Sequence, residues 1–327
     1  MKAILCSQYG GPDDLVLTDV ADPVAGDGEA VVIVKAAALN FFDTLMIQGK
    51  YQVKPPFPFS PAGEVSGIIE SIGKGVIDLK PGDRVVAFCE HNGAREKIAL
   101  PATSIVRIPD GLDFDRAAGL VIIYGTALHA LEDRGSPTKG ETLAVLGAAG
   151  GTGLAACELG RILGLKVIAC ASTDEKLEFA REHGADLLLN YSKEDLKEGL
   201  KKHSGGKGVD IVFDPVGGAY AEAALRALAW EGRFLVIGFA GGEIPKIPLN
   251  LALLKACDIR GVFWGAWTQR NSAKNRANLE RLVAWAAEGK ISSHVDRVFP
   301  LAETAKALKV LSGRQAMGKV ILHPAEA

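Results

Sequence analysis

The middle third of the chain alternates short apolar runs with longer stretches that have helical character. The apolar runs, which suit strands buried on both faces of a sheet, cover 143–146, 166–171, 187–190, 209–214, 233–238 and 259–264. The helical stretches cover 154–163, 173–183, a polar segment that ends near residue 203, and 218–230. Strands that alternate with helices in this way are connected by right-handed crossovers, so the pattern predicts one parallel α/β sheet.

The segments before and after this region have a different pattern. Short β-like runs at 2–5, 15–20, 29–38, 64–72 and 84–88 are separated by glycine and proline turns, which predicts a compact, mostly antiparallel β domain. Beyond residue 264 follow a long amphipathic helix (271–288), a strand (296–299), a helix (302–311) and a closing strand (319–322). Four elements are too few for a third core, so we expect this tail to pack back on the β domain.

These patterns predict two domains, one inserted in the other. Residues 1–122 and 267–327 form the β-rich domain, and residues 123–266 form the nucleotide-binding domain. Ligands of an open parallel sheet bind at the carboxyl ends of its strands. We therefore expect the functional site in a cleft between the two domains.

Composition and charge exclude several classes of protein. With 327 residues, 48% of them hydrophobic, the chain is not disordered and has room for two domains. A net charge of −2, from 37 basic and 39 acidic residues, argues against a nucleic-acid partner. No apolar run is long enough for a membrane span, and residues 1–8 become polar too soon for a secretion signal. The five scattered cysteines form no C-x-x-C pair, so we expect neither disulfides nor a cysteine-rich zinc site, and a cytoplasmic location.

The most informative motif lies in residues 143–154. Four apolar residues lead into a turn of small residues, and the first long helix is predicted directly after it. The spacing Ala148-x-Gly150-x-x-Gly153 is the dinucleotide-binding fingerprint with its first glycine replaced by alanine. The start of such a helix leaves backbone N–H groups unpaired, and a pyrophosphate binds such groups. We therefore assign to a cofactor site the turn residues Ala148, Gly150, Gly151, Thr152 and Gly153.

Motifs along nearly the whole chain resemble, in order, those of the medium-chain dehydrogenase/reductases. They lie at residues 40–43 with 49–51, 61–67, 80–85, 124–127, 148–153, 184–186 and 318–320. Within that superfamily the chain resembles the zinc-independent NADPH:quinone oxidoreductases. The resemblance implies a GroES-like β-rich catalytic domain, a Rossmann-type doubly wound parallel sheet, NADPH as cofactor and a homodimer.

The resemblance also bears on metal binding. The zinc-dependent relatives place a cysteine where this chain has Asn40 and a histidine where it has Gly63. Without these ligands a catalytic zinc would lack the three protein ligands that it needs. Cys89 and His91 lie close together, but two ligands do not make a zinc site. We expect no metal.

The end of the second predicted strand favours NADPH over NADH. NAD-dependent domains usually carry an acid there, whereas this strand ends in Ala171. Asp174 lies at about the expected distance from the glycines. A capping box from Ser172 to Glu175, however, would put Asp174 in the first helical turn, pointing away from the ribose.

A 2′-phosphate would suit the polar groups that gather near this strand. The Ser172 hydroxyl, Lys176 in the following helix and Tyr191 after the third strand would converge on it. The family resembled uses Lys and Tyr at these motif positions; a solvated lysine and a half-buried tyrosine are the alternatives. By resemblance Arg314 adds a further positive contact, unless it is only a surface charge.

Other candidates for cofactor contact follow later strands. Gly238 and Phe239 come after the fifth strand and Phe263 belongs to the sixth, where they would flank the nicotinamide. Aromatic residues at such places are more often core or dimer contacts than walls of a cofactor site, so the glycines are the better candidates. Gly217, in the turn after the fourth strand, either borders the cofactor or serves only that turn.

The candidates for catalysis come mainly from the β domain. By resemblance Asn40 and Asp43 approach the nicotinamide, where the Asn40 amide would donate to an acceptor oxygen that gains charge as hydride arrives. A local turn network is the alternative for this pair. Tyr51 is the most plausible phenolic donor to the substrate carbonyl, and Thr126 either contacts the nicotinamide or caps its helix.

These candidates favour one reaction class over its competitors. No residue pair resembles a strong acid–base dyad, and no nucleophile-elbow motif indicates hydrolysis. A quinone or α,β-unsaturated carbonyl suits such a site because its reduced form can take a proton from solvent, whereas alcohol oxidation in relatives relies on zinc. We predict an NADPH-dependent oxidoreductase that transfers hydride to such acceptors without metal.

Two alternatives remain open for the function. One is an enoyl-thioester reductase of the acryloyl- or crotonyl-CoA type, for which Lys50 and Lys54 give a hint of a basic groove. The other is a non-catalytic NADPH-binding protein. By resemblance the partner is a second copy of the chain, which would pair edge to edge through residues 258–267.

Overall fold

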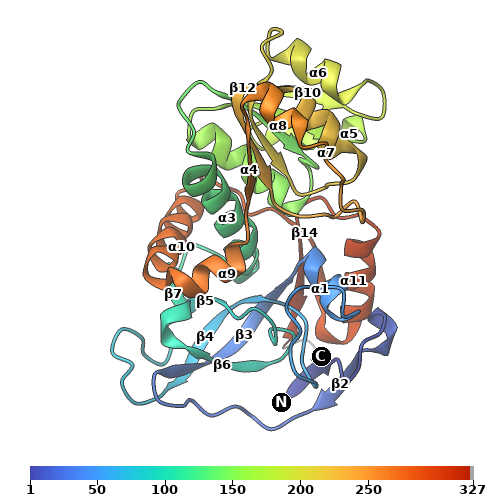
Figure 1. The fold of residues 1–327 in the computed structure, drawn as a ribbon. Coiled ribbons are helices and arrows are strands. Elements are labelled where there is room, and N and C mark those ends of the chain that lie inside the picture. The colour runs from blue at the N-terminus through green and yellow to red at the C-terminus, as the bar shows by residue number, and fades with distance from the viewer. Residues whose placement is uncertain (325–327) are drawn as a thin grey trace. The chain divides into compact units, whose positions relative to one another are not determined.

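The computed structural model describes residues 1–324 of the chain. It contains two compact units, one formed by Met1–Ile122 with Thr268–Ala327 and the other by Ile123–Trp267. The first unit is therefore discontinuous in sequence. Figure 1 shows the helices and strands of both units, coloured along the chain.

The second unit is built around a parallel sheet of six strands in the order β10-β9-β8-β11-β12-β13. The chain moves outward from β8 through β9 to β10 and then returns to the other side of β8 with β11. The carboxyl ends of β8 and β11 thus meet at a topological switch point, where ligands of open α/β sheets bind. The predicted parallel sheet is confirmed. Its strands are β8 (Thr142–Leu146), β9 (Lys166–Ala171), β10 (Leu187–Asn190), β11 (Val209–Asp214), β12 (Leu228–Val236) and β13 (Asp258–Gly261).

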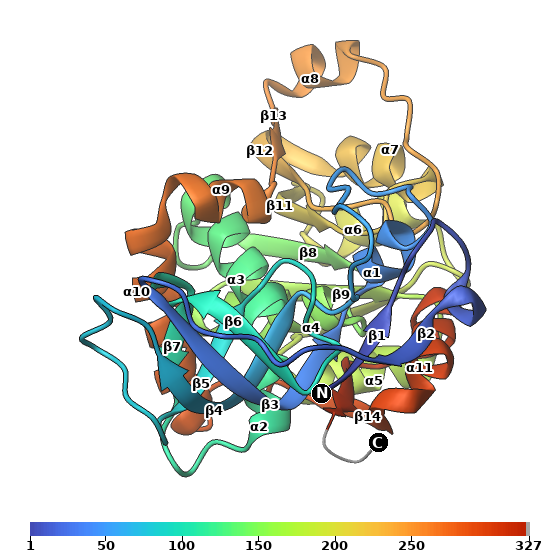
Figure 2. The same cartoon turned by 90° about the horizontal axis from the view of Figure 1, so that it is seen from below.

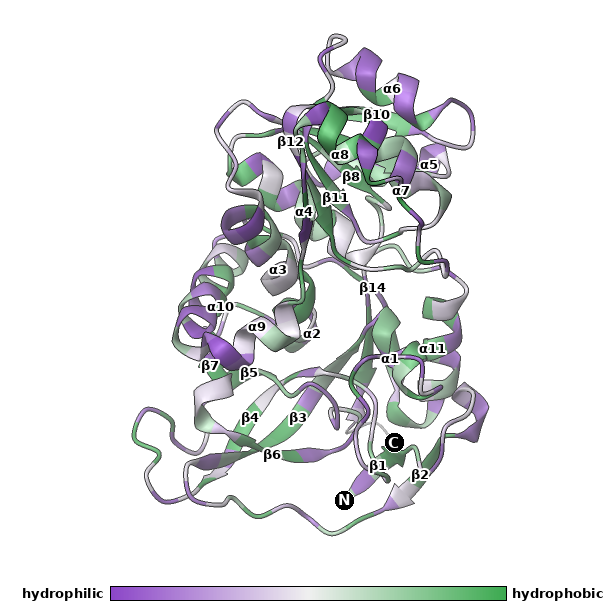
Figure 3. Ribbon diagram, in the orientation of Figure 1, coloured by the Kyte–Doolittle hydropathy of each residue, from purple (hydrophilic) through white to green (hydrophobic). Residues whose placement is uncertain are grey.

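One helix of this unit shows how an amphipathic sequence packs on the sheet. In α6 (Leu196–His203), Leu196 and Leu200 are buried one turn apart while Glu198 and Lys202 are exposed. Figure 3 shows the same division, with hydrophobic residues on β8 and β11 and hydrophilic residues along α6. Within residues 1–324, no helix combines the length and the apolar character needed to cross a bilayer. The other helices in this part of the chain are α3 (Val121–Leu128), α4 (Gly151–Ile162), α5 (Asp174–Glu182), α7 (Ala219–Arg226), α8 (Asn250–Lys255) and α9 (Trp264–Arg270), with a π-helix at His129–Gly135.

The first unit contains a seven-stranded sheet in the order β14-β15-β3-β4-β5-β7, and β6 pairs with β3 as well. All pairs are antiparallel except β14 with β15. Val320 of the C-terminal strand lies opposite Leu39 of β3, so the tail packs back on the β domain as predicted. The strands are β3 (Glu29–Leu39), β4 (Glu64–Ile72), β5 (Arg84–Phe88), β6 (Lys97–Pro101), β7 (Ile105–Arg107), β14 (Val295–Pro300) and β15 (Lys319–His323), with β1 (Lys2–Leu5) and β2 (Val16–Asp19) forming a separate hairpin. The helices are α1 (Phe41–Met46), α2 (Phe114–Ala118), α10 (Ser272–Ala287) and α11 (Thr304–Ser312).

Two predicted elements have other bounds in the structure, and two strands were missed. The helix predicted over 218–230 ends at Arg226, because Leu228 already pairs with Val209 and is buried in β12. The strand predicted over 259–264 ends at Gly261, since Trp264 begins α9. The short strands β6 and β7 were not predicted. Both are short, and β7 is three residues long, so their pairing with β3 and β5 decides their structure rather than their own pattern.

Candidate functional site

The turn after β8 has the backbone arrangement of a phosphate-binding site. Helix α4 begins after Gly150, which has no side chain to cap the N–H groups of the first turn. A Cβ on Gly153 would lie 2.3 Å from the carbonyl oxygen of Gly147, so only glycine permits this approach of helix to strand. Ala148 is fully buried and its N–H donates to the carbonyl of Cys170 at 3.2 Å. Gly151 and Thr152 lie in the first turn of α4. The residues predicted for the cofactor site therefore lie at the N-terminal end of this helix, where its backbone N–H groups are uncapped.

The helix after β9 starts differently from the prediction. Thr173, not Ser172, is the N-cap of α5, and its side chain accepts from the N–H of Lys176 at 3.3 Å. Ser172, half-buried, lies one residue before the cap. This shift leaves Asp174 as the first residue of the helix, so its predicted place in the first turn is confirmed. The sequence offers two hydroxyl residues in succession, and backbone geometry alone decides which one caps.

Asp174 is held by residues from the end of β10. Its carboxylate accepts a hydrogen bond from Asn190 Nδ2 at 2.6 Å and pairs with the ammonium of Lys193. These contacts, first of all the one with Lys193, lower the pKa of Asp174. The acid is thus ionised and engaged within the protein. Lys176 lies in the first turn of the same helix and is partly buried, and Tyr191 is half-buried with its ring 4.3 Å from that of Tyr220.

The loops after β11 and β12 are joined by backbone hydrogen bonds. The N–H of Ala240 donates to Pro215 and that of Gly241 to Val216. Gly217 has a φ of 68°, and a Cβ there would lie 2.8 Å from the ring of Phe239. Gly238 donates to the carbonyl of Asp214 at 3.3 Å. The predicted Gly217, Gly238 and Phe239 therefore lie together, whereas Phe263 follows β13 and is half-exposed.

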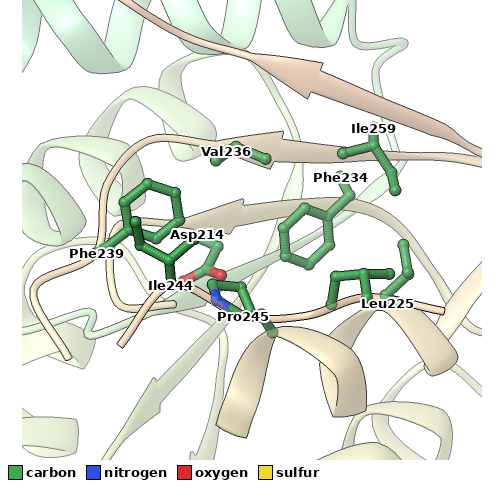
Figure 4. Close-up of a pocket in the computed structure, with 10 residues that line it drawn as sticks. Asp214, Leu225, Phe234, Val236, Phe239, Ile244, Pro245 and Ile259 are labelled. Carbon is green, nitrogen blue, oxygen red and sulfur yellow. The ribbon is translucent and has the colours of Figure 1, made fainter. Parts of the chain in front are cut away.

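Phe239 also lines an apolar pocket of about 150 Å³ beside these loops (Figure 4). Val236, Phe234 and Ile259 supply other walls, and the carboxyl group of Asp214 points into the space between them. Oδ1 of Asp214 accepts the N–H groups of Val216 and Gly217, both at 2.8 Å. Burial nevertheless raises the pKa of this carboxyl group. Asp214 therefore holds the turn that contains Gly217.

The first unit contains a buried polar cluster around Asn40, between β3 and α1. Asn40 Nδ2 donates to Glu64 Oε1 at 2.9 Å, and Asn40 Oδ1 accepts from Lys319 Nζ at 2.7 Å. Lys319 forms an ion pair with Glu64 at 2.7 Å, and their side chains are 2% and 0% exposed. Asp43 lies beside them, fully buried, and accepts the N–H of Asn40 at 2.7 Å and that of Ala62 at 2.9 Å.

Glu64 and Lys319 were not predicted to belong to the site. Both lie in motifs that carry the family resemblance, and each is a charged residue at the start of an otherwise largely apolar strand. Lys and Glu are almost never fully buried unless they are paired. This signal could have marked both residues, but only the pairing of β15 with β3 and of β3 with β4 brings them to Asn40.

The other predicted catalytic residues have distinct surroundings. Tyr51 stacks on Phe42 with ring centroids 5.2 Å apart, and burial raises the pKa of its phenol to about 12. The phenol is therefore a neutral donor at physiological pH. Thr126 is the sixth residue of α3, so the alternative that it caps this helix is wrong. Arg314 is exposed in the turn after α11, with a φ of 54°.

The positions that hold zinc in the relatives of the resembled family are shaped differently here. A Cβ on Gly63 would lie 2.9 Å from the carbonyl oxygen of Glu90 and 3.0 Å from the ring of Phe42. An imidazole has no room at that position. Burial raises the pKa of the Cys89 thiol well above its usual range, and His91 is half-buried with its pKa lowered by burial. Residues 1–324 contain no group of three or more His, Cys, Asp or Glu side chains placed to hold a metal.

Asp43 is expected to make stability depend on pH. Burial raises the pKa of Asp43 from 3.8 to about 7 in the folded protein, although hydrogen bonds from two backbone N–H groups and the positive charge of Lys319 oppose the shift. Between these values the folded state binds more protons than the unfolded state, so the free energy of unfolding falls as pH rises, by up to about 1.4 kcal/mol per pH unit. Urea unfolding of the wild type and of Asp43→Asn from pH 4 to 8 measures this effect as the free energy of unfolding of the wild type minus that of the variant. This difference should decline up to pH 7 and then level off. A difference that rises with pH would contradict the prediction.

Known proteins are similar to this chain over nearly its whole length. The family described as zinc-binding dehydrogenase matches residues 151–284, and the alcohol dehydrogenase GroES-like domain matches residues 26–110. Quinone oxidoreductase-like protein 2 of Bos taurus is 39% identical over 322 residues, which cover 98% of this chain and 92% of that protein. Quinone oxidoreductase of Homo sapiens is 32% identical over 98% of this chain and 97% of its own length. The crystal structure of Escherichia coli quinone oxidoreductase complexed with NADPH is similar with a TM-score of 0.92 and 28% identity, covering 99% of this chain and 100% of that one.

Proposed function

Because the chain belongs to the quinone oxidoreductase-like branch of the medium-chain dehydrogenase/reductases, we propose that it is an NADPH-dependent oxidoreductase that transfers hydride to a quinone or an α,β-unsaturated carbonyl compound. Similarity to named quinone oxidoreductases over nearly their full length is the observation that carries this proposal. Both the dinucleotide-binding unit and the β-rich unit are therefore present in this chain.

The second unit fits the cofactor. The uncapped N–H groups at the start of α4 suit the pyrophosphate, and Gly150 leaves room for it. Ser172, Lys176 and Tyr191 are the residues of this unit that would hold the 2′-phosphate. Arg314, which belongs to the first unit, is proposed from the resemblance alone as a further positive charge. The engagement of Asp174 by Asn190 and Lys193 supports the phosphorylated cofactor, because this acid is not left to accept from a ribose hydroxyl. When bound, NADPH supplies the hydride.

The residues of the first unit would bind and polarise the acceptor. The Nδ2 group of Asn40 has a second hydrogen besides the one given to Glu64, and we propose that it donates to the acceptor oxygen as negative charge develops there. Tyr51 remains protonated up to about pH 12 and would donate a second hydrogen bond. Asp43 holds the Asn40 turn through two backbone N–H groups, so we assign it a positioning role. The reduced acceptor then takes its proton from solvent.

We also propose that the reaction needs no metal. The structure supports this at Gly63, where the backbone of Glu90 and the Phe42 ring fill the space that an imidazole would need. It supports it again at Asn40, whose amide is already bound on both sides by Glu64 and Lys319. Activity unchanged by dialysis against a chelator is expected, and loss restored by Zn²⁺ would refute the proposal.

An acceptor screen tests the function. NADPH oxidation is followed at saturating cofactor with 1,4-benzoquinone, an enal and crotonyl-CoA, and Asn40→Ala serves as the control for turnover at this site. Turnover of the quinone or enal, reduced about 100-fold or more in Asn40→Ala, is expected from the loss of one donor to the developing oxyanion. Preference for crotonyl-CoA would instead favour an enoyl-thioester reductase, and NADPH binding without oxidation of any acceptor would favour a non-catalytic role.

A homodimer through the edge of the sheet is part of the proposal. Strand β13 is the outermost strand next to β12, and α8, which directly precedes it, lies at the outer end of a long connection (Figure 2). Leu253 and Leu254 of α8 are 79% and 67% exposed, which suits a surface covered by a second copy. Sedimentation should give a dimer for the wild type and a monomer for Leu253→Asp. An unchanged sedimentation coefficient would contradict this interface.

We propose a cytoplasmic location as well. The cysteines Cys6, Cys89, Cys157, Cys170 and Cys257 are all free thiols, and burial raises their pKa values. Such thiols suit a reducing compartment.

A further inference from the structure

The buried pair Glu64–Lys319 lies directly behind the amide of Asn40. We infer that Glu64 and Lys319 are positioning residues that fix which end of the Asn40 amide is available to the acceptor, an inference that rests on the proposed function. Their contacts with Asn40 are direct and short, at 2.9 Å and 2.7 Å. Neither side chain is exposed enough to meet the acceptor itself.

The ammonium group of Lys319 has no hydrogen left to give. Its three N–H donors are directed at the carbonyl of Leu39 (3.0 Å), Oδ1 of Asn40 (2.7 Å) and Oε1 of Glu64 (2.7 Å). The lysine stem also packs against Gly119, where a Cβ would lie 3.0 Å from Lys319 Cγ. With every donor engaged, Lys319 is placed to orient its neighbours rather than to deliver a proton.

Glu64 is engaged in the same way. Oε1 accepts from Asn40 and Lys319, and Oε2 accepts the N–H of Ile122 at 2.7 Å. This backbone contact fixes the carboxylate from outside the Asn40 turn. A fully buried carboxylate needs such compensation, and it receives three hydrogen bonds here.

These two charges allow the Asn40 amide only one orientation. Lys319 offers donors alone and Glu64 offers acceptors alone, so Oδ1 must face the ammonium and Nδ2 the carboxylate. A flipped amide would place its NH2 group against the ammonium and its oxygen against the carboxylate. The free position of Asn40 is therefore an N–H donor, which is the polarity that a developing oxyanion requires.

Removal of both charges together tests the inference without leaving an unpaired buried charge. The double variant Lys319→Met/Glu64→Gln should fold, bind NADPH within about threefold of the wild type, and lose about 100-fold in kcat with the acceptor found in the screen. The single variant Lys319→Arg keeps the cation beside Glu64, so its kcat should lie between that of the double variant and that of the wild type. Lys309→Met, which removes an exposed lysine paired with Asp13, is the matched control and should leave kcat unchanged.

A cycle with Asn40→Ala shows whether the pair acts through Asn40. If it does, the two charge substitutions lower kcat no further once the amide is gone. An equal loss of kcat in both backgrounds would assign the pair a role in folding alone and overturn the inference.

The second readout does not depend on turnover. In ¹⁵N spectra the side-chain resonances of Asn40 are assigned by their loss in Asn40→Asp. The Nδ2 hydrogen that is bonded to Glu64 should exchange slowly with solvent in the wild type and at least tenfold faster in Lys319→Met/Glu64→Gln. Fast exchange in the wild type, or exchange unchanged in the double variant, would overturn the inference. If the acceptor screen finds no substrate, the proposed function fails while this measurement still decides the orientation of the amide.

Discussion

Replacing Gly153 with alanine is expected to prevent the turn after β8 from packing. The added Cβ would lie 2.3 Å from the carbonyl oxygen of Gly147 and 2.9 Å from Cα of Ala148, and both neighbours are backbone atoms that cannot rotate away. Overpacking usually costs about 1–3 kcal/mol, and a clash with backbone belongs at or beyond the upper end of that range. Urea unfolding should show a loss of about 3 kcal/mol or more, together with the loss of NADPH binding.

Gly150→Ala is the matched control for this prediction. Its Cβ would approach Gly147 O only to 3.4 Å, and its φ of −77° and ψ of 161° are open to alanine. The fold should therefore keep its stability within about 0.5 kcal/mol. The methyl group would instead stand over the N–H groups of α4, so the Kd for NADPH should rise about tenfold or more. Equal stability of both variants would show that Gly153 is not packed as described.

Replacing Lys176 with alanine is expected to change the choice of cofactor. If Lys176 holds the 2′-phosphate, it contributes a charge-assisted hydrogen bond of about 1.5–3 kcal/mol, which corresponds to a rise of about 10- to 100-fold in the Kd for NADPH. NADH has no 2′-phosphate, so its Kd should stay within about twofold. Fluorescence titration with both cofactors measures the two constants side by side.

Arg181→Ala provides the control for a loss of positive charge from the same helix. Arg181 lies in the last turn of α5 and pairs with Glu178 at 2.6 Å, so its removal should leave both constants unchanged. Parallel losses of NADPH and NADH affinity in Lys176→Ala would indicate a general effect on the helix. A wild type that binds NADH more tightly than NADPH would refute the roles proposed for Lys176 and Tyr191.

The central strands of the second unit were predictable because their residues are buried on both faces of the sheet. Residues 166–171 and 209–214 are mostly apolar runs, and β9 and β11 have these same bounds. The fingerprint around Gly153 was equally clear, since a close approach of helix to strand leaves room for glycine alone. Where a local pattern was ambiguous the prediction was wrong. The alanine-rich stretch after Gly218 continues past Arg226 without a glycine or proline, and only the pairing of Leu228 with Val209 ends the helix at Arg226.

The choice of cap before α5 shows a second limit. Ser172 and Thr173 are both suitable N-cap residues, and the sequence alone favoured Ser172 because Glu175 completes a capping box with it. The extended backbone of Thr173, with φ −137° and ψ 153°, makes it the cap instead. When two neighbouring residues can both cap a helix, the backbone conformation after the preceding strand decides which of them is the N-cap.

The sequence by itself determined the class of fold and predicted the turn around Gly153 and Asn40 as candidate site residues, because periodicity, glycine spacing and motif order are local properties of the chain. The tertiary structure decided what surrounds Asn40. Lys319 is distant from Asn40 in sequence, and it reaches that amide because β15 pairs with β3, while Glu64 arrives on β4. A buried charge is stable only beside its partner, and that partnership is a property of strand pairing that no local pattern contains.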